Sequence, residues 1–239
     1  MNTPHTAIVL AAGLGTRMKP LTDTLPKPLI EVAGKPLIDW CLDWLSLAGV
    51  ARAVVNVSYM AEQMEAHLAQ RARPRVSISR EETPLETGGG VMKALPLLGR
   101  GPFVAMNSDA IFPPSVPHPL QKLGEAWRDE LDFLMLLVPR ERALGREGKG
   151  DFIQDKSGRV RWPQPGEEAP YVFSGVEIVH PRVFEGCTQG AFPMRELWQR
   201  SEQPDGWHSR IRSVVHDGPW LSVGDPGGLK TAEEFLVAR

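Results

Sequence analysis

The first 110 residues alternate between strand-like and helical stretches, and this alternation restricts the fold more than any other feature. Short apolar or β-rich runs are separated by stretches whose apolar residues have helical spacing. In chain order, strands and helices in turn, the stretches are 6–11, 36–48, 52–58, 61–70, 76–79, 90–98 and 103–106. Strands separated by helices are typical of a parallel sheet with helices on both faces. We therefore expect an α/β fold.

The second half of the chain is less regular. A polar interval rich in Gly and Pro, 140–170, separates two strongly apolar stretches that we expect to be strands, 131–138 and 171–179. The remaining expected elements are short strands near 152–154 and 160–162, a strand at 220–223 and a helix at 228–237. At 239 residues the length favours one domain, 1–239. We expect a small lobe at about 139–219 to be inserted between the first half, 1–138, and the closing strand and helix, 220–239.

Composition excludes several classes of protein. The net charge of −2 gives no basic footprint for a nucleic-acid partner. No apolar run approaches the ~18 residues that span a bilayer, so we expect no membrane segment. Cys41 and Cys187 are isolated and indicate buried thiols in a reducing cytoplasm rather than a disulfide. The six histidines never have the spacing of a zinc site.

A glycine-containing loop, 10–20, follows the first strand. Gly13 and Gly15 let the backbone approach a ligand closely, with free N–H groups that can bind phosphate oxygens. Arg17 adds a fixed positive charge there. Met18 stands where a dinucleotide fingerprint has its third glycine, and the loop is not a Walker A motif. On its own the loop is also compatible with a tight turn that binds nothing.

A lysine between two prolines follows the loop. Pro26 and Pro28 each restrict the backbone, so the stretch around Lys27 is expected to be extended and the lysine held in one place. Together, the segments 10–20 and 25–28 resemble the L-A-A-G-x-G-T-R and P-K-P signature of the sugar-phosphate nucleotidylyltransferases.

Further segments resemble one branch of that family, the N-acetylmuramate 1-phosphate uridylyltransferases of peptidoglycan recycling. They are 84–90, 94–99, 150–152, 173–175 and 184–192. The resemblance implies a Rossmann-like, mostly parallel sheet flanked by helices, of the nucleotide-diphospho-sugar transferase type. It also implies a cytoplasmic, Mg²⁺-dependent enzyme that joins UTP and N-acetylmuramate 1-phosphate, giving UDP-N-acetylmuramate and pyrophosphate. The first half would bind the nucleotide and the lobe the sugar.

The resemblance also assigns roles to residues. Arg17 and Lys27 would be catalytic, at the β/γ-phosphates and near the reacting α-phosphate respectively. The nucleotide would be bound by Leu10, Ala11, Ala12, Gly13, Leu14, Gly15, Thr16, Arg17, Lys27, Glu81, Thr87, Gly88 and Asn107. The sugar would be bound by Asp109, Gly150, Asp151, Ser174 and Gly175.

The metal site departs from the family pattern. Asp109 follows the strand 103–106, at the edge of the sheet where ligands of open α/β folds gather, and matches the family's metal aspartate. The family's second metal aspartate, in W-x-D-V-G-T, is replaced here by Ser222. Three accounts remain: Asp109 suffices because phosphates supply the other oxygens, Asp225 reaches in, or activity has been lost.

Substrate identity stays open at this level. Glu81 only accepts hydrogen bonds, which suits uracil N3–H as well as guanine N1–H and its amino group. The family's sugar-side lysine is missing, and Arg146 or Lys149 are the nearby cations. The alternatives are therefore a GTP-dependent mannose or heptose 1-phosphate guanylyltransferase and a non-catalytic relative that binds a sugar nucleotide. The sequence indicates no oligomeric state.

Overall fold

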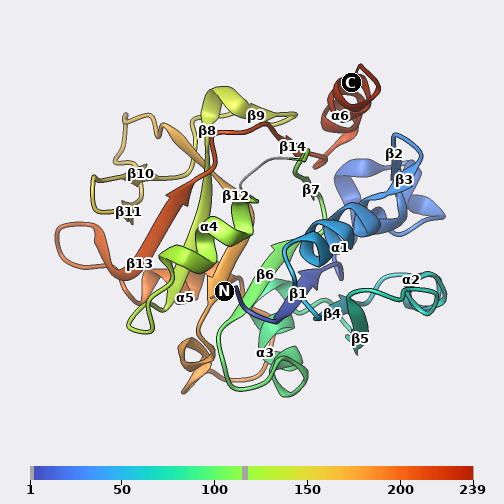
Figure 1. The fold of residues 1–239 in the computed structure, drawn as a ribbon, viewed down its shortest axis with the longest axis horizontal. Coiled ribbons are helices and arrows are strands. Elements are labelled where there is room, and N and C mark those ends of the chain that lie inside the picture. Colours follow the sequence, from blue (N-terminus) through green and yellow to red (C-terminus); the bar gives the residue numbers. More distant parts are fainter. Residues whose placement is uncertain (1–2, 115–117, 239) are drawn as a thin grey trace.

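The computed structural model describes residues 3–114 and 118–238. Its strands are β1 (Thr6–Leu10), β2 (Glu31–Val32), β3 (Lys35–Pro36), β4 (Arg52–Val57), β5 (Arg75–Arg80), β6 (Phe103–Asn107), β7 (Ala110–Ile111), β8 (Phe133–Pro139), β9 (Ala143–Leu144), β10 (Ile153–Gln154), β11 (Arg159–Arg161), β12 (Tyr171–Val179), β13 (Trp207–Val215) and β14 (Trp220–Ser222). Its α-helices are α1 (Leu37–Leu47), α2 (Ala61–Leu68), α3 (Glu86–Leu98), α4 (Pro119–Ala126), α5 (Met194–Gln199) and α6 (Pro226–Val237). The arrangement is drawn in Figure 1.

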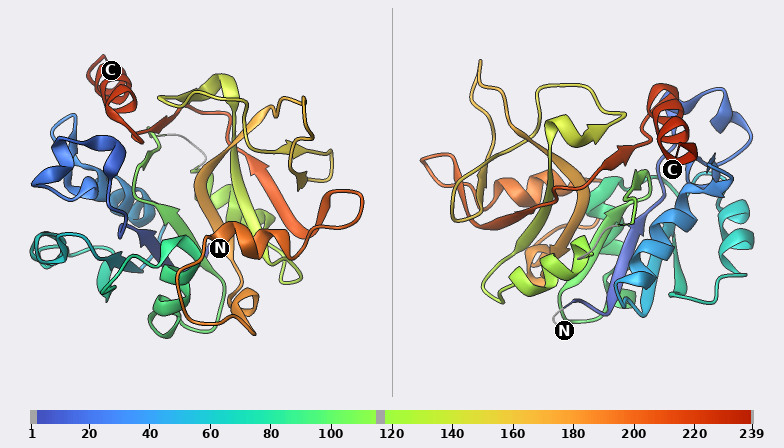
Figure 2. Two further views of the ribbon diagram at one scale, coloured as in Figure 1. Left: turned by 180° about the vertical axis from the view of Figure 1, so that it is seen from behind. Right: turned by 45° about the horizontal axis from the view of Figure 1, so that its top comes forward.

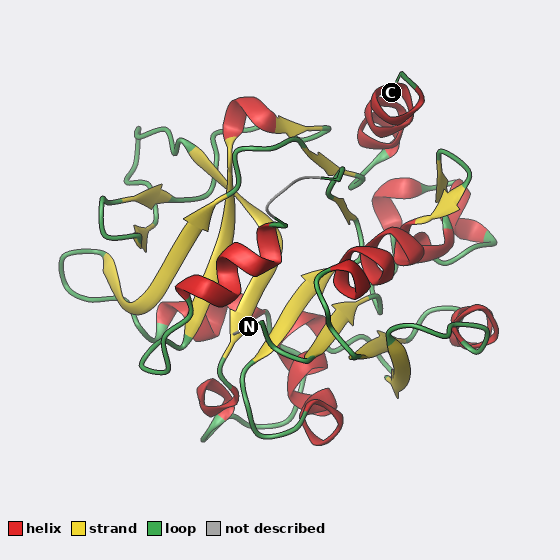
Figure 3. Cartoon of the chain, viewed as in Figure 1, coloured by secondary structure: helices red, strands yellow, loops and turns green. Residues whose placement is uncertain are grey.

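The central sheet has nine strands within the described residues, in the order β10-β11-β13-β8-β12-β6-β1-β4-β5. The four strands β6, β1, β4 and β5 are all parallel, which confirms the α/β alternation expected from the sequence. β12 runs antiparallel to both of its neighbours, β6 and β8, while β8 and β13 are parallel. The Rossmann-like fold with helices on both faces is confirmed (Figure 3).

Helices cover both faces of this sheet. Alternate residues of β1 point to opposite sides, so Ala7 and Val9 pack into one core and Ile8 into another. The first core contains apolar residues of α1, α2 and α4, and the second contains those of α3 and α5. Figure 2 shows the sheet between these two layers. Because β1, β4 and β6 are parallel, their carboxyl ends lie together at one edge of the sheet.

A smaller structure brings the end of the chain to that edge. β14 pairs with β7 and with β9 in a three-stranded sheet, and α6 follows directly. Met18 of the glycine loop, Ile111 of β7 and Ala232 of α6 pack in one buried cluster. This cluster fixes the residues just after β14 against the loop that follows β1.

Several elements differ from those expected. α3 begins at Glu86, four residues earlier than predicted, and β13, α4 and α5 were not predicted. β12 and β13, which fall in the interval expected as an inserted lobe, belong to the central sheet. In the described part of the chain, no helix is long and apolar enough to cross a membrane.

Candidate active site

The loop after β1 requires glycine at position 15. Gly15 has φ of 63°, in the left-handed region that favours glycine. A Cβ added there would lie 2.9 Å from Thr22 Cγ2 and 3.0 Å from Lys27 Cβ. The Thr22 hydroxyl donates to the Gly15 carbonyl at 2.9 Å. Close contact with these later residues thus sets the path of the loop and brings it beside Lys27.

Lys27 and Asp109 form an ion pair at the edge of the sheet. Lys27 Nζ lies 2.6 Å from Asp109 Oδ2, and the two side chains are 13% and 29% exposed. Lys27 begins a 3-10 turn, Lys27–Leu29, and is not in the extended stretch that the prolines suggested. The fixed φ of Pro28 is compatible with the first turn of a helix, so the same proline that restricts the backbone also permits this turn.

The thiol of Cys41, on α1, supports the turn that carries Asp109. It donates to the carbonyls of Asn107 and Ala110, at 3.7 and 3.6 Å. Burial raises the pKa of this thiol, and the charge of Asp109 raises it further, so the thiol keeps its proton and its role as donor. Cys41 is therefore a structural residue, in accordance with the expected free, buried thiol.

A buried polar pair lies next to the loop; of its two members Glu81 was expected from the sequence, and Asn56 was not. Asn56, at the end of β4, is 2% exposed, and its Oδ1 accepts from the Ala11 N–H at 2.7 Å. Its Nδ2 donates to Glu81 Oε1 at 2.8 Å, and Glu81 Oε2 accepts from the Leu85 N–H at 2.9 Å. The Asn56–Glu81 pair therefore connects the start of the glycine loop to the residue before α3. Only the position of Asn56 at the end of a parallel strand could have indicated it.

The first cleft, of about 420 Å³, lies over these residues. It is lined by Leu10, Ala11, Ala12, Gly13, Gly15, Thr16, Arg17, Lys27, Pro28, Asn56, Glu81, Pro84, Glu86, Thr87, Asn107, Ser108, Asp109 and Gly224. Leu14 and Gly88 were expected to bind the nucleotide, but they are not among the described residues that line this cleft. Leu14 is 50% exposed, and Gly88 is covered by Phe192, whose carbonyl accepts from the Gly88 N–H at 2.9 Å.

The second cleft, of about 800 Å³, adjoins the first. Its lining includes three of the five residues expected to bind the sugar: Asp109, Ser174 and Gly175. Four residues line both clefts: Arg17, Asn107, Asp109 and Gly224. A Cβ added at Gly224 would lie 3.5 Å from Arg17 Nη2. The backbone just after β14 therefore passes close to the guanidinium of Arg17.

The other two residues expected at the sugar, Gly150 and Asp151, are not in the described lining of either cleft. Gly150, with φ of 77°, forms a tight turn, and a Cβ there would lie 2.2 Å from the Ala169 carbonyl oxygen. Asp151 instead accepts hydrogen bonds from Arg146 and from the Phe173 N–H. Asp151 therefore supports the wall of the second cleft through two of its lining residues, Arg146 and Phe173.

The residues at the junction fit a cation held mainly by phosphates. No group of three or more His, Cys, Asp or Glu side chains that could hold a metal occurs in the described residues. Ser222 lines the second cleft but is neutral. Asp225 Oδ1 accepts from the Gly228 N–H at 2.9 Å and so caps α6. Mg²⁺ commonly uses one or two carboxylates together with substrate phosphates, and Asp109 supplies one.

Comparisons with known proteins agree with this geometry. Residues 6–145 match the sequence profile of the family described as Nucleotidyl transferase. The chain is 43% identical over 240 residues to the N-acetylmuramate alpha-1-phosphate uridylyltransferase of Caulobacter vibrioides, covering 98% of each chain. It is 36% identical to the protein of that name from Neisseria meningitidis, covering 97% of this chain and 98% of that one. The fold is shared with HddC from Yersinia pseudotuberculosis complexed with GMP-PN, at a TM-score of 0.78, 22% identity and coverage of 97% and 99%.

Proposed function

The chain belongs to the Nucleotidyl transferase family, and from that premise we propose that it joins UTP to N-acetylmuramate 1-phosphate. It is a sugar-1-phosphate nucleotidylyltransferase. In the proposed reaction an oxygen of the sugar phosphate bonds to the α-phosphorus of UTP, and the bond from that phosphorus to the β-phosphate oxygen breaks. The products are UDP-N-acetylmuramate and pyrophosphate, a step we assign to peptidoglycan recycling.

One observation carries this proposal: two clefts meet at Arg17, Asn107, Asp109 and Gly224. A transfer between two phosphates needs each substrate in its own space and the reacting groups at a shared boundary. The first cleft lies over the glycine loop, whose backbone N–H groups suit a triphosphate. The second cleft contains Ser174 and Gly175 and suits the sugar.

The chain's own residues have little proton chemistry to perform. A phosphate monoester has a second pKa of about 6, so the attacking sugar phosphate is already ionised at neutral pH. What remains is to align two anions that repel each other and to neutralise the charge of the leaving pyrophosphate. We assign the first task to Lys27, at the reacting phosphate, and the second to Arg17, at the β- and γ-phosphates.

The family generally uses a divalent metal, and we propose Mg²⁺ held by Asp109 and by the phosphates of the substrates. When bound, the metal would neutralise phosphate charge. Lys27 holds the carboxylate of Asp109 in place before substrates arrive. Ser222 at the position of the family's second aspartate is compatible with this account, because phosphate oxygens complete the coordination.

The base would lie between the loop and the start of α3. Glu81 keeps spare acceptor capacity after its bonds to Asn56 and Leu85, since a carboxylate has about four lone-pair sites. Its proposed contact is the N3–H of uracil, and the names of the two relatives favour UTP. The free thiols of Cys41 and Cys187 support a cytoplasmic setting for the reaction.

The test is pyrophosphate release with Mg²⁺, crossing UTP, GTP, CTP and dTTP with the 1-phosphates of N-acetylmuramate, N-acetylglucosamine, mannose and glucose. We expect the highest kcat/KM for UTP with N-acetylmuramate 1-phosphate. The highest value for GTP with mannose 1-phosphate would instead support a guanylyltransferase. Nucleotide binding without turnover in any pair would support a non-catalytic relative.

A further inference from the structure

The second cleft is lined by a basic side chain, that of Arg146, to which the proposed reaction assigns no role. Two basic side chains line it, Arg17 and Arg146, together with the acidic residues Asp109, Glu147 and Asp225, within the described part of the chain. Arg17 also lines the first cleft, where the triphosphate would lie, whereas Arg146 lines the second cleft alone. Arg146 therefore lies in the cleft that we propose for the sugar, and it is not among the residues shared by the two clefts.

The guanidinium of Arg146 is held by a carboxylate that is itself held by the backbone. Arg146 Nη2 donates to Asp151 Oδ1 and Oδ2, at 2.7 and 2.8 Å. Asp151 Oδ2 also accepts from the Phe173 N–H at 2.8 Å, which connects the pair to β12 of the central sheet. Asp151 therefore fixes one end of the arginine at the rigid wall of the cleft.

The rest of the guanidinium is available for a ligand. An arginine has five N–H donors, and among the described residues only Nη2 has hydrogen-bond partners, so Nη1 and Nε keep theirs. The side chain is 37% exposed, so a ligand can reach it without a rearrangement of the backbone. A planar fork of donors that is fixed at one end suits a second carboxylate.

We propose that Arg146 binds an acidic substituent on the sugar ring, with Asp151 as its positioning residue. This inference rests on the proposed function, because N-acetylmuramate differs from N-acetylglucosamine by a lactyl ether that ends in a carboxylate. The 1-phosphate is the other anion of the substrate, but it must lie at the junction with Arg17 in order to react. Arg146 thus makes the second cleft selective for an acidic sugar.

The test measures binding of UDP-N-acetylmuramate and UDP-N-acetylglucosamine by calorimetry, which needs no turnover. Arg146→Ala should weaken binding of UDP-N-acetylmuramate roughly 10- to 100-fold, the usual size for hydrogen bonds to a charged group. Binding of UDP-N-acetylglucosamine should change less than about twofold, because its sugar has no carboxylate that Arg146 could bind. Arg146→Lys should recover part of the loss, because it restores the charge without the planar fork.

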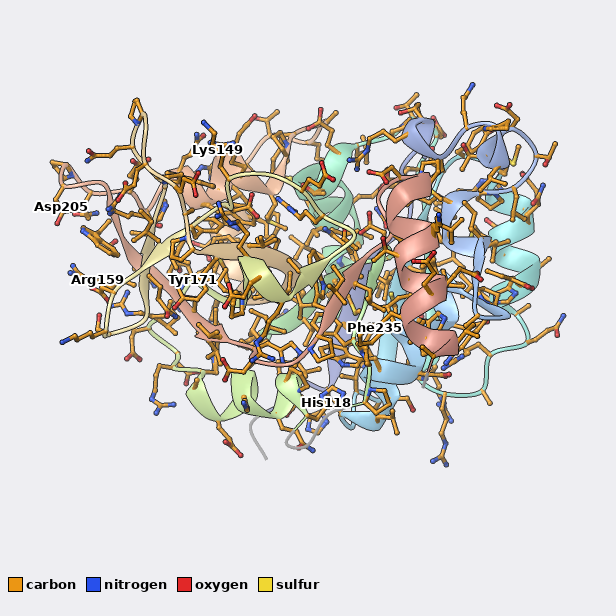
Figure 4. All side chains as sticks on the ribbon, turned by 90° about the horizontal axis from the view of Figure 1, so that it is seen from above. His118, Lys149, Arg159, Tyr171, Asp205 and Phe235 are labelled. Carbon is orange, nitrogen blue, oxygen red and sulfur yellow. The ribbon has the colours of Figure 1, made fainter. Side chains whose placement is uncertain are left out.

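Two further variants separate positioning from charge. Asp151→Asn keeps an acceptor for the Phe173 N–H but weakens the hold on Arg146, so it should reduce the preference for UDP-N-acetylmuramate by a smaller factor. Lys149→Ala removes an exposed neighbouring cation that lies outside the lining of the second cleft, and it should change neither affinity. Figure 4 shows Lys149 in the half of the molecule that also carries Arg159 and Tyr171, away from Phe235 on α6.

The outcomes separate this inference from the proposed function. If Arg146→Ala weakens binding of both nucleotide sugars equally, or of neither, Arg146 does not bind the carboxylate and the inference is wrong. The proposed function would survive that result as long as the unchanged protein binds and makes UDP-N-acetylmuramate. If the unchanged protein does not bind UDP-N-acetylmuramate, both the function and the inference fail.

Discussion

Lys27 Nζ contacts Asp109 Oδ2 at 2.6 Å and connects the turn after the glycine loop to the end of β6. The two residues are 82 positions apart in the chain; Asp109 lines both clefts, and Lys27 reaches it from the first. The contact therefore places the cation and the carboxylate that a phosphate transfer requires at one point before either substrate binds.

Removal of Lys27 should reduce turnover strongly. Lys27→Ala takes away a positioned charge at the reacting phosphate, and we expect kcat/KM to fall roughly 10²- to 10³-fold. Lys19→Ala is the matched control, because Lys19 lies in the neighbouring glycine loop but is 61% exposed and pairs with Asp23. Steady-state pyrophosphate release measures both variants. Equal losses in the two variants would mean that Lys27 acts only through the general positive charge around the first cleft.

The metal requirement should depend on Asp109 and not on Asp225. Asp225→Ser retains an oxygen that can cap α6 but removes the carboxylate, so the Mg²⁺ concentration at half-maximal rate should stay unchanged. Ser222→Asp adds a carboxylate to the second cleft, and it should lower that concentration several-fold. A titration of activity with Mg²⁺ measures both effects. A large rise in the requirement of Asp225→Ser would assign Asp225 to the metal.

The Asn56–Glu81 pair should control nucleotide affinity as well as stability. Asn56→Ala leaves the Ala11 N–H and a Glu81 oxygen buried without partners, which costs about 1–3 kcal/mol of unfolding free energy. Because Ala11 begins the glycine loop, the KM for UTP should also rise, while the KM for the sugar phosphate changes less. Urea unfolding and steady-state kinetics measure these quantities. An unchanged KM for UTP would limit the pair to a structural role.

Acid should destabilise the fold through His118. Burial is the main cause that lowers the pKa of His118 from 6.5 to about 4; the nearby His216 contributes to the decrease, and a hydrogen bond with the Trp44 backbone opposes it. Its Nδ1 accepts from the Leu120 N–H at 3.2 Å and caps α4, a bond that needs this nitrogen unprotonated. The folded state binds this proton less readily than the unfolded state, so stability is complete above about pH 6.5 and declines as pH falls toward 4.

His118→Asn retains a capping side chain and removes the titration. Urea midpoints at pH 7 and pH 5 should therefore differ less in this variant than in the unchanged protein. His5→Asn replaces an exposed histidine and should leave the difference as it was. If His118→Asn loses as much stability between the two pH values as the unchanged protein, the titration of His118 is not responsible.

The parallel half of the sheet and the glycine loop could be predicted because their signals are local. β1, β4 and β6 each contain a run of at least three consecutive apolar residues, and Gly13 to Arg17 are contiguous in the chain. β13 was missed because Arg210 and Arg212 interrupt its apolar pattern, and its buried residues, such as Ile211, are recognisable only once β8 lies beside it. The antiparallel placement of β12 likewise depends on partners distant in the chain.

The same distinction applies to the site. Lys27 and Asp109 were predicted separately from two motifs, and their contact could not be, since it depends on how two turns pack. Asn56 has no motif around it, and its role follows from the Ala11 N–H that it meets in the fold. Asp151 was expected to bind sugar, but the fold pairs it with Arg146. Side-chain contacts that form only in the folded chain therefore escape prediction from the sequence, while contiguous motifs do not.

The most direct test of the account is the product itself. The protein is incubated with UTP, N-acetylmuramate 1-phosphate and Mg²⁺, and nucleotide sugar and pyrophosphate are quantified together by mass spectrometry and a pyrophosphate assay. The account predicts one UDP-N-acetylmuramate for each pyrophosphate, and loss of both products in Lys27→Ala. Pyrophosphate accompanied by UMP without nucleotide sugar, or bound UTP with no turnover, would contradict it.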